Sequence, residues 1–291
     1  MLNQRKQRTI EKPVTVEGFG YWSGRDVRVD FRPAPVGTGI VFVRTDLSSP
    51  ARIPAQIAHR IESPRRTTLV RNKAAVEMVE HILAALAGLQ IDNCELAVNA
   101  PEMPGCDGSS QLFVEALDRA GVVEQAGYRD QLVVREVTRL GDDNCWIEAR
   151  PATAPGLSIR YRLDYGPGNG IGRQTLLMQL TPQSFREEIA PCRTFLLKEE
   201  ADWLVAQGIG GRASIKDLLI FGEHGPLDNV LRFSDECVRH KILDVVGDLS
   251  LSGCDIVGQI VAHKSGHRLN AELVRVLLTE CERVGVRRKC A

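Results

Sequence analysis

One sequence pattern occurs twice in the chain, and this repeat restricts the fold more than any other feature. The first copy is residues 79–89 and the second is residues 238–249, and in each an apolar segment follows, at 93–98 and 253–258. The copies lie about 160 residues apart, whereas solenoid repeats recur about every 20–50 residues. The repeat therefore predicts two related domains. The alternative is a chance similarity between two amphipathic helices.

The second copy places His240, Asp244 and Asp248 in one row along a helix, at positions i, i+4 and i+8. Side chains four residues apart have Cβ atoms about 5–6 Å apart, so an imidazole and a carboxylate can reach one metal ion at about 2.0–2.2 Å. His-x-x-x-Asp on a helix is, however, more often a solvated pair or a hydrogen bond. If the copies form a symmetric pair, His81 and His240 can face each other across a domain interface, where ligand sites are common.

Length and charge restrict the class of protein. The 291 residues suit one large or two medium domains, and the 37 Lys and Arg residues equal the 37 Asp and Glu residues. This balance argues against bulk nucleic-acid binding. The sequence has no apolar run of 18 or more residues, and its polar first eight residues lack the core of a signal peptide. The eight cysteines never form Cys-x-x-Cys, so we expect a reduced, cytoplasmic protein.

Strands and helices mix without a regular β-α-β order, which predicts an α+β fold rather than a doubly wound sheet. We expect one domain at residues 1–127 and another at 128–291, with the junction between Gly121 and Asp130. The predicted elements nearest the motifs are helices at 78–89, 110–120 and 265–284 and strands at 94–98, 132–137 and 256–262.

Short motifs along nearly the whole chain match one enzyme family in order. They include Arg32-Pro33-Ala34-Pro35, Arg44-Thr45-Asp46-Leu47, Asn99-Ala100-Pro101-Glu102, Asp107-Gly108-Ser109, Arg193-Thr194-Phe195, Leu231-Arg232-Phe233, Lys264-Ser265-Gly266-His267 and the two repeated helices. By these motifs the sequence resembles the zinc-dependent UDP-3-O-acyl-N-acetylglucosamine deacetylases of lipid A biosynthesis. The resemblance implies two similar α+β domains with the active site at their interface.

The resemblance also implies a zinc site. His81, His240 and Asp244 would hold Zn²⁺ and leave a fourth position for water, the arrangement that hydrolytic zinc requires. Glu80 would be the general base that takes a proton from that water. Without the match, Glu80 would be a helix carboxylate of no special role.

Three further residues would complete the catalytic group. His267 would face the departing amine, Asp248 would orient His267, and Thr194 would donate a hydrogen bond to the tetrahedral intermediate. Without the match, His267 would be an ordinary residue of a Gly/Ser turn.

The resemblance implies contacts with the remainder of the substrate as well. Lys241 and Lys264 would meet the diphosphate or sugar, although lysines on helices are usually only solvated, and Phe195 would meet the sugar or uracil. An insert at about residues 208–231 would form an apolar tunnel for the acyl chain. Its segment 218–221 is apolar enough to line one, but fits an ordinary buried strand equally well.

The sequence departs from the family pattern at three places. Tyr21-Trp22 stand where the family has leucine and histidine, Met78 replaces a threonine, and Leu196-Leu197 replace Gly-Phe. The implied function is removal of acetate from UDP-3-O-acyl-N-acetylglucosamine, with the UDP-acyl-sugar as small-molecule partner. The alternatives are a paralogue that binds a UDP-lipid without turnover and a deacetylase of another N-acetyl sugar nucleotide. We expect a monomer with at most peripheral membrane contact.

Overall fold

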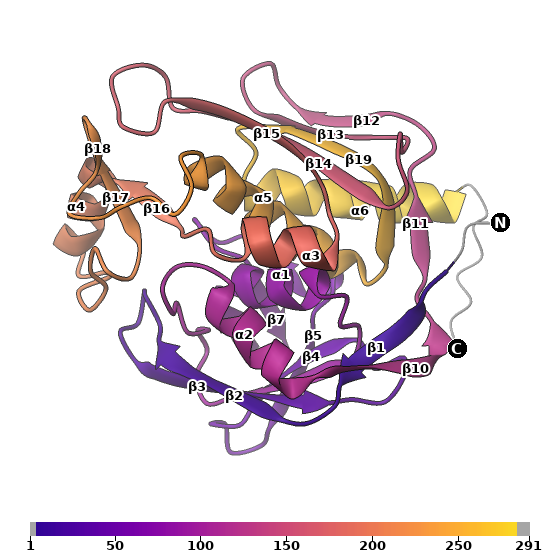
Figure 1. The fold of residues 1–291 in the computed structure, drawn as a ribbon. Coiled ribbons are helices and arrows are strands. Elements are labelled where there is room, and N and C mark those ends of the chain that lie inside the picture. The colour runs from indigo at the N-terminus through magenta and orange to yellow at the C-terminus, as the bar shows by residue number, and fades with distance from the viewer. Residues whose placement is uncertain (1–3, 284–291) are drawn as a thin grey trace.

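The computed structural model describes residues 4–283, and the side chains as far as residue 280. Its layers are two mixed β-sheets with helices between them (Figure 1). The first sheet has the strand order β2 (Val14–Phe19), β3 (Asp26–Pro33), β9 (Cys94–Val98), β4 (Ile40–Arg44) and β5 (Ala51–Pro54).

The second sheet repeats the topology of the first. Its order is β12 (Thr138–Gly141), β13 (Trp146–Arg150), β19 (Asp255–His263), β14 (Leu157–Asp164) and β15 (Arg173–Gln179), and β11 (Gln131–Val133) pairs with β19. In both sheets the first, second and last pairs are antiparallel and the third pair is parallel. The repeat in sequence therefore corresponds to a repeat in strand order.

The α+β class is confirmed, whereas the division into two domains stays a prediction. The expected boundary at residue 127 falls inside β10 (Val122–Tyr128), which pairs with β1 (Lys6–Ile10). The strand expected at 132–137 is wrong in its extent: β11 ends at Val133 and β12 begins at Thr138.

Of the described helices, α1 (Glu80–Gly88), α2 (Gln111–Ala120), α5 (Glu236–Leu249) and α6 (His267–Arg283) lie between the sheets (Figure 1). Helices α1 and α5 pack against each other near the middle of the molecule (Figure 1). All residues of α1 except Ala87 are buried, as expected for a helix that is apolar nearly all round. Met78 has φ +56° and turns the chain sharply from β8 (Ala74–Glu77) into α1.

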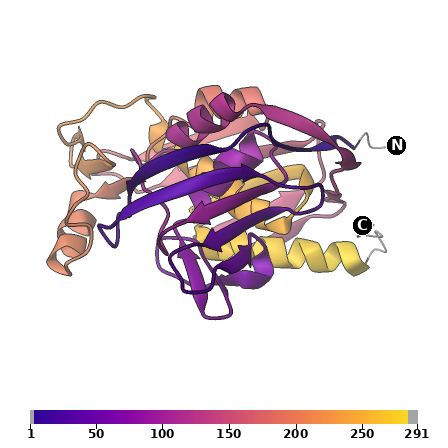
Figure 2. The ribbon, with the colours of Figure 1, turned by 90° about the horizontal axis from the view of Figure 1, so that it is seen from below.

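A small unit projects from one end of the molecule and is visible on the left of Figures 1 and 2. It consists of β16 (Phe195–Leu197), α4 (Lys198–Ala206), β17 (Leu219–Gly222) and β18 (Gly225–Pro226). Strand β16 pairs in parallel with β17, so this unit begins at Phe195 rather than at the expected residue 208. The difference arises because β16 has only three residues, too few to show the apolar–polar alternation by which a strand is predicted from sequence.

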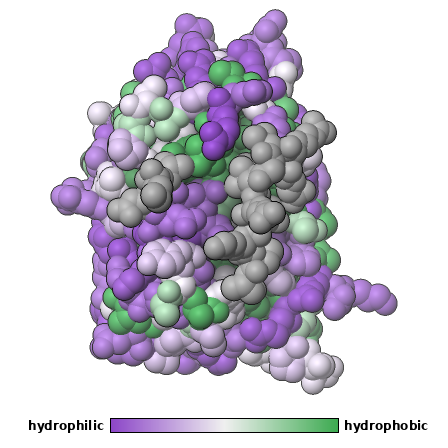
Figure 3. Space-filling model, turned by 90° about the vertical axis from the view of Figure 1, so that its right-hand side faces the viewer, coloured by the Kyte–Doolittle hydropathy of each residue, from purple (hydrophilic) through white to green (hydrophobic). Residues whose placement is uncertain are grey.

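The remaining elements are short. They are η1 (Ile57–His59), β6 (Arg60–Ile61), β7 (Thr68–Arg71), α3 (Pro182–Ser184), the π-helical η2 (Phe185–Ile189) and η3 (Ser250–Ser252). Strands β6, β7 and β8 form a three-stranded sheet. Among the described helices, none combines the length and the apolar character needed to cross a membrane. The face opposite the projecting unit is mostly hydrophilic where it is not covered by grey atoms (Figure 3).

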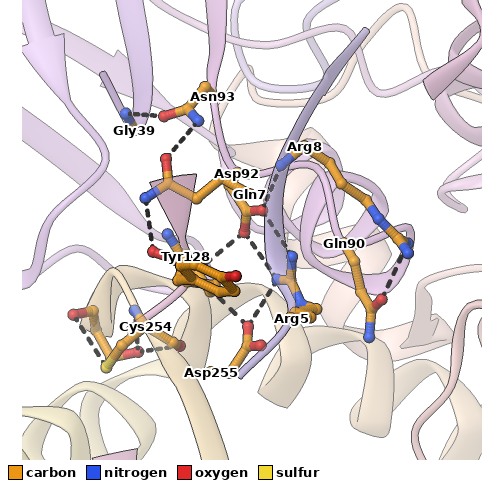
Figure 4. Close-up of polar contacts among 12 residues, drawn as sticks. Arg5, Gln7, Arg8, Gly39, Gln90, Asp92, Asn93, Tyr128, Cys254 and Asp255 are labelled. Atoms are coloured by element: carbon orange, nitrogen blue, oxygen red, sulfur yellow. Dashed lines mark hydrogen bonds and ion pairs between the residues drawn. The ribbon is translucent and has the colours of Figure 1, made fainter. Parts of the chain in front are cut away.

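An ionic network joins the two halves of the chain (Figure 4). Arg5 forms two hydrogen bonds with the carboxylate of Asp92, at 2.7 and 2.8 Å, and one with Asp255 at 2.8 Å. The Arg129 guanidinium lies 3.1 Å from Asp92 and 3.6 Å from Asp255. Asp92 precedes β9 and Asp255 begins β19, so two arginines bridge equivalent ends of the two central strands.

Gly247 allows α5 to approach α1 closely. A Cβ atom at this position would lie 2.2 Å from the carbonyl oxygen of Glu80, a distance at which the backbone of one helix must move. Because Glu80 and His81 begin α1, the position of both side chains relative to α5 depends on this contact.

We expect Gly247→Ala to lower the free energy of unfolding by about 1–3 kcal/mol, the usual cost of overpacking a core. Urea denaturation followed by circular dichroism measures the change. Gly211→Ala is the matched control, because its new Cβ would meet no atom within 4 Å. Equal stability of the two variants would contradict the importance of the helix contact.

Candidate functional site

Three donor side chains from α1 and α5 meet at one point between the helices. The ligand atoms of His81, His240 and Asp244 all lie within 4.8 Å of one another. Oδ1 of Asp244 is 3.8 Å from Nε2 of His81 and 3.4 Å from Nε2 of His240. Ligands about 2.0–2.2 Å from a tetrahedral zinc ion lie about 3.3–3.6 Å apart, so small shifts of these side chains would bring all three to one ion.

The protonation states also suit a metal. Nδ1 of His240 donates a hydrogen bond to the carbonyl oxygen of Cys192 at 3.0 Å, which leaves the lone pair of Nε2 free. Burial lowers the pKa of both histidines, and with the added charge of His240 the pKa of His81 falls to about 3. Neutral imidazoles are the form that binds metal.

Lys241 contacts the carboxylate ligand. Its ammonium lies 2.6 Å from Oδ2 of Asp244, so Oδ1 remains to face the two imidazoles. Burial alone would raise the pKa of Asp244, but the charges of Lys241 and His240 outweigh it and hold this pKa far below its usual range. The carboxylate is therefore ionised.

Glu80 is buried beside the donor group, at the first position of α1. Its Oε2 accepts a hydrogen bond from the backbone N–H of Thr67 at 2.9 Å. Burial raises the pKa of the Glu80 carboxyl to about 7, although the charge of His267 opposes the shift. A carboxylate with this pKa can accept a proton near neutral pH.

His267 and Asp248 form a pair next to Glu80. Nδ1 of His267 lies 2.8 Å from Oδ2 of Asp248, and the amide of Asn270 donates to the same oxygen at 2.8 Å. Burial alone would lower the pKa of His267, but the charge of Asp248 and the hydrogen bond between them raise it to about 9. His267 is therefore a cation at neutral pH and can release a proton.

The other expected residues differ in how close they lie to this centre. Thr194 lines a pocket together with Glu80 and His81, and the ring of Phe195 packs edge-on to the ring of His240 at 6.2 Å between centroids. Lys264 is exposed, and its backbone N–H donates to the carbonyl of Arg162. The structure thus gathers nine of the ten expected residues around α1 and α5, with Lys264 on the surface.

An apolar pocket extends from Glu80 and His81 into the projecting unit. Its walls include Leu196, Leu204, Val205, Ile209, Leu218 and Ile220. Residues 218 and 220 face the pocket while 219 and 221 are fully buried, so β17 has one face in the pocket and one in the core. Alternate residues of segment 218–221 therefore face the pocket and the core, and a tunnel for an acyl chain stays a prediction.

Four of the five residues that depart from the family pattern line this pocket, Leu197 being the exception. Tyr21, Trp22 and Met78 all line it. The hydroxyl of Tyr21 donates to the carbonyl of Asp217 at 2.5 Å, and the guanidinium of Arg66 lies 4.3 Å above the Trp22 ring. The Tyr21 hydrogen bond ties the first half of the chain to the loop before β17.

Two residues of the site were missed by sequence reasoning. Asn270 holds Asp248, and its position three residues after His267, on the same helix face, is a signal that could have found it. Thr67 contacts both Glu80 and Asp248, but it precedes a short strand with no distinguishing pattern. Its contacts depend on tertiary structure alone.

Comparison with known proteins points to the same enzyme family as the motifs. The sequence profile of the UDP-3-O-acyl N-acetylglycosamine deacetylase family matches residues 7–279. A Shewanella sp. (strain W3-18-1) protein named UDP-3-O-acyl-N-acetylglucosamine deacetylase is 39% identical over 277 residues, which cover 94% of this chain and 90% of that protein. Proteins of the same name from Shewanella baltica (strain OS155) and Shewanella sp. (strain ANA-3) are each 38% identical over the same shares.

We expect the purified protein to hold about one zinc ion per chain, since three nitrogen and oxygen donors and an open position suit that ion. Asp244→Ala and His240→Ala each remove a donor and should lower the zinc content measured by plasma mass spectrometry. Glu80→Gln is the control, because Glu80 lies beside the donors without being one of them. Full zinc occupancy in Asp244→Ala would place the metal elsewhere.

Proposed function

The chain belongs to the UDP-3-O-acyl N-acetylglycosamine deacetylase family, and on that premise we propose that it removes acetate from UDP-3-O-acyl-N-acetylglucosamine in lipid A biosynthesis. The observation that carries the proposal is the set of buried donors His81, His240 and Asp244 with Glu80 and His267 beside them. A protein that only bound a UDP-lipid would have no need of both an acid and a base at this place.

Glu80 and the three donor side chains would act on the attacking water. Zinc held by His81, His240 and Asp244 would supply a Lewis acid and lower the pKa of water at its open position. Glu80, fixed by the Thr67 N–H, takes a proton from the water as the oxygen adds to the amide carbon.

The remaining residues act on the two products. The hydroxyl of Thr194 donates a hydrogen bond to the oxyanion that forms on the amide oxygen. The carbon–nitrogen bond then breaks, and His267, held by Asp248, gives its proton to the departing nitrogen. Acetate and the free amine of the UDP-3-O-acyl-glucosamine leave the site.

The apolar pocket supports an acyl substrate. Its aliphatic walls lie next to Glu80 and His81, as a lipid chain attached near the reacting amide would require. Phe195 and Lys241 lie at the donor group, where they can meet the sugar and its diphosphate. For the expected substrate contact of Lys264, no contact between its side chain and the described site residues adds support. Both halves of the site come from one chain, as a monomeric enzyme requires. The monomeric state, the cytoplasmic location and at most peripheral membrane contact all stay predictions.

We expect mass spectrometry to show conversion of UDP-3-O-acyl-N-acetylglucosamine to the amine and acetate by the zinc-loaded protein. Glu80→Gln should keep its zinc and lose rate by about 10²–10⁴-fold, the usual contribution of a positioned base. Glu115→Gln, an exposed carboxylate on α2, should match the wild type. If the zinc-loaded wild type binds the UDP-lipid without turnover, the protein is a paralogue that only binds this substrate. If it turns over only other N-acetyl sugar nucleotides, it is a deacetylase of a different substrate.

A large side chain in the pocket should change the preferred acyl length. Ala213 lines the pocket, whereas Lys216 on the same loop is exposed. We expect Ala213→Trp to raise KM for a long-chain substrate by about 10-fold or more and for a short-chain analogue much less, because lost burial of several CH₂ groups costs about 0.8 kcal/mol each. Lys216→Trp is the control. Equal effects of Ala213→Trp on both substrates would mean that the acyl chain binds elsewhere.

A further inference from the structure

Thr67 contacts the base Glu80 directly, and it contacts Asp248, the residue that holds the acid His267. We propose that Thr67 is a positioning residue that keeps Glu80 and His267 at a fixed separation during the reaction. This inference rests on the proposed function, since it concerns the same two proton transfers. It adds a residue from the turn before β7, a segment that supplies no metal donor.

The contacts of Thr67 are directional. Its backbone N–H donates to Oε2 of Glu80 at 2.9 Å, and its carbonyl accepts from the N–H of Val79 at 3.4 Å. Its hydroxyl donates to Oδ1 of Asp248 at 2.6 Å, because a carboxylate can only accept. Thr67 itself is fully buried, so no solvent competes for these bonds.

Asp248 transmits the contact to the acid. Its Oδ1 accepts from Thr67, and its Oδ2 accepts from His267 and Asn270. Within the described part of the chain, Thr67 is the residue whose hydrogen bonds reach both Glu80 and Asp248. The base belongs to the first half of the chain and the acid to the second, so this link fixes one half against the other at the reacting atoms.

Loss of the hydroxyl would leave Oδ1 of a buried carboxylate without its donor. A short bond to a charged oxygen is among the stronger hydrogen bonds, and its loss allows the Asp248 carboxylate to rotate. His267 would move with it. A misplacement of about 1 Å can cost about 10² in rate, because the proton must be transferred over a short and fixed distance.

The chain offers a matched pair for the test. Thr67→Val keeps the shape and the backbone N–H, and therefore the bond to Glu80, but removes the bond to Asp248. Thr67→Ser keeps the hydroxyl. Thr68 is the control, because it is the next residue, is also buried, and its hydroxyl has no hydrogen-bond partner among the described residues.

We expect Thr67→Val to lower kcat about 10- to 100-fold, with KM and zinc content within about 3-fold of the wild type. Thr67→Ser should restore kcat to within about 3-fold, and Thr68→Val should match the wild type. Should Thr67→Val not fold, Thr67→Ala carries the same expectation with a smaller side chain. A general loss of stability would affect Thr67→Val and Thr68→Val alike and would not be rescued by serine.

A double-mutant cycle separates this role from others. If Thr67 acts through Asp248, Thr67→Val should lower kcat by less than about 3-fold in the Asp248→Asn background, because the partner is already changed. Additive losses, a wild-type kcat in Thr67→Val, or failure of serine to rescue would each overturn the inference. Absence of turnover in the wild type would instead overturn the proposed function.

Discussion

The close packing of α1 against α5 is the constraint on which the rest of the structure depends. Gly247 has no side chain, and the carbonyl of Glu80 occupies the space that a Cβ would need. This approach brings the His81 and His240 rings to 5.0 Å between centroids, nearly perpendicular to each other. Two sheets of equal strand order hold the helices from opposite sides (Figure 1), so the donors meet where the two repeats touch.

The site concentrates ionisable side chains in the interior of the molecule. Asp244, Asp248 and Glu80 lie among His81, His240, His267 and Lys241, all of them buried or nearly so. Two of the carboxylates are held by opposite charges, Asp244 by Lys241 and Asp248 by His267, and Glu80 accepts a hydrogen bond from the Thr67 N–H. Such pairs are unfavourable to bury unless their hydrogen bonds are complete, so the network restricts the side chains to one arrangement.

The sequence predicted the parts of the fold that have a period or a repeated motif. The helix expected at 78–89 corresponds to α1 (Glu80–Gly88), and the strand at 94–98 corresponds to β9. The spacing of His240 and Asp244 predicted that both lie on one helix face, and the family resemblance identified them as candidate metal donors. Thr67, β16 and the contact at Gly247 had no such signal, because they depend on residues far apart in sequence. The assigned roles of the site residues stay predictions.

The network around Arg5 has a consequence for the order in which the molecule is made. Arg5 contacts Asp255, a residue 250 positions later, so Arg5 cannot complete its contacts until Asp255 has been synthesised. The candidate metal donors His240 and Asp244 on α5 also follow long after α1 in the sequence. Contacts of such long sequence separation form slowly, because closing a long loop costs conformational entropy before the stabilising contacts have formed. The emerging first half therefore exposes the surface of α1 that α5 later covers, and the docking of the halves completes the core and the site together.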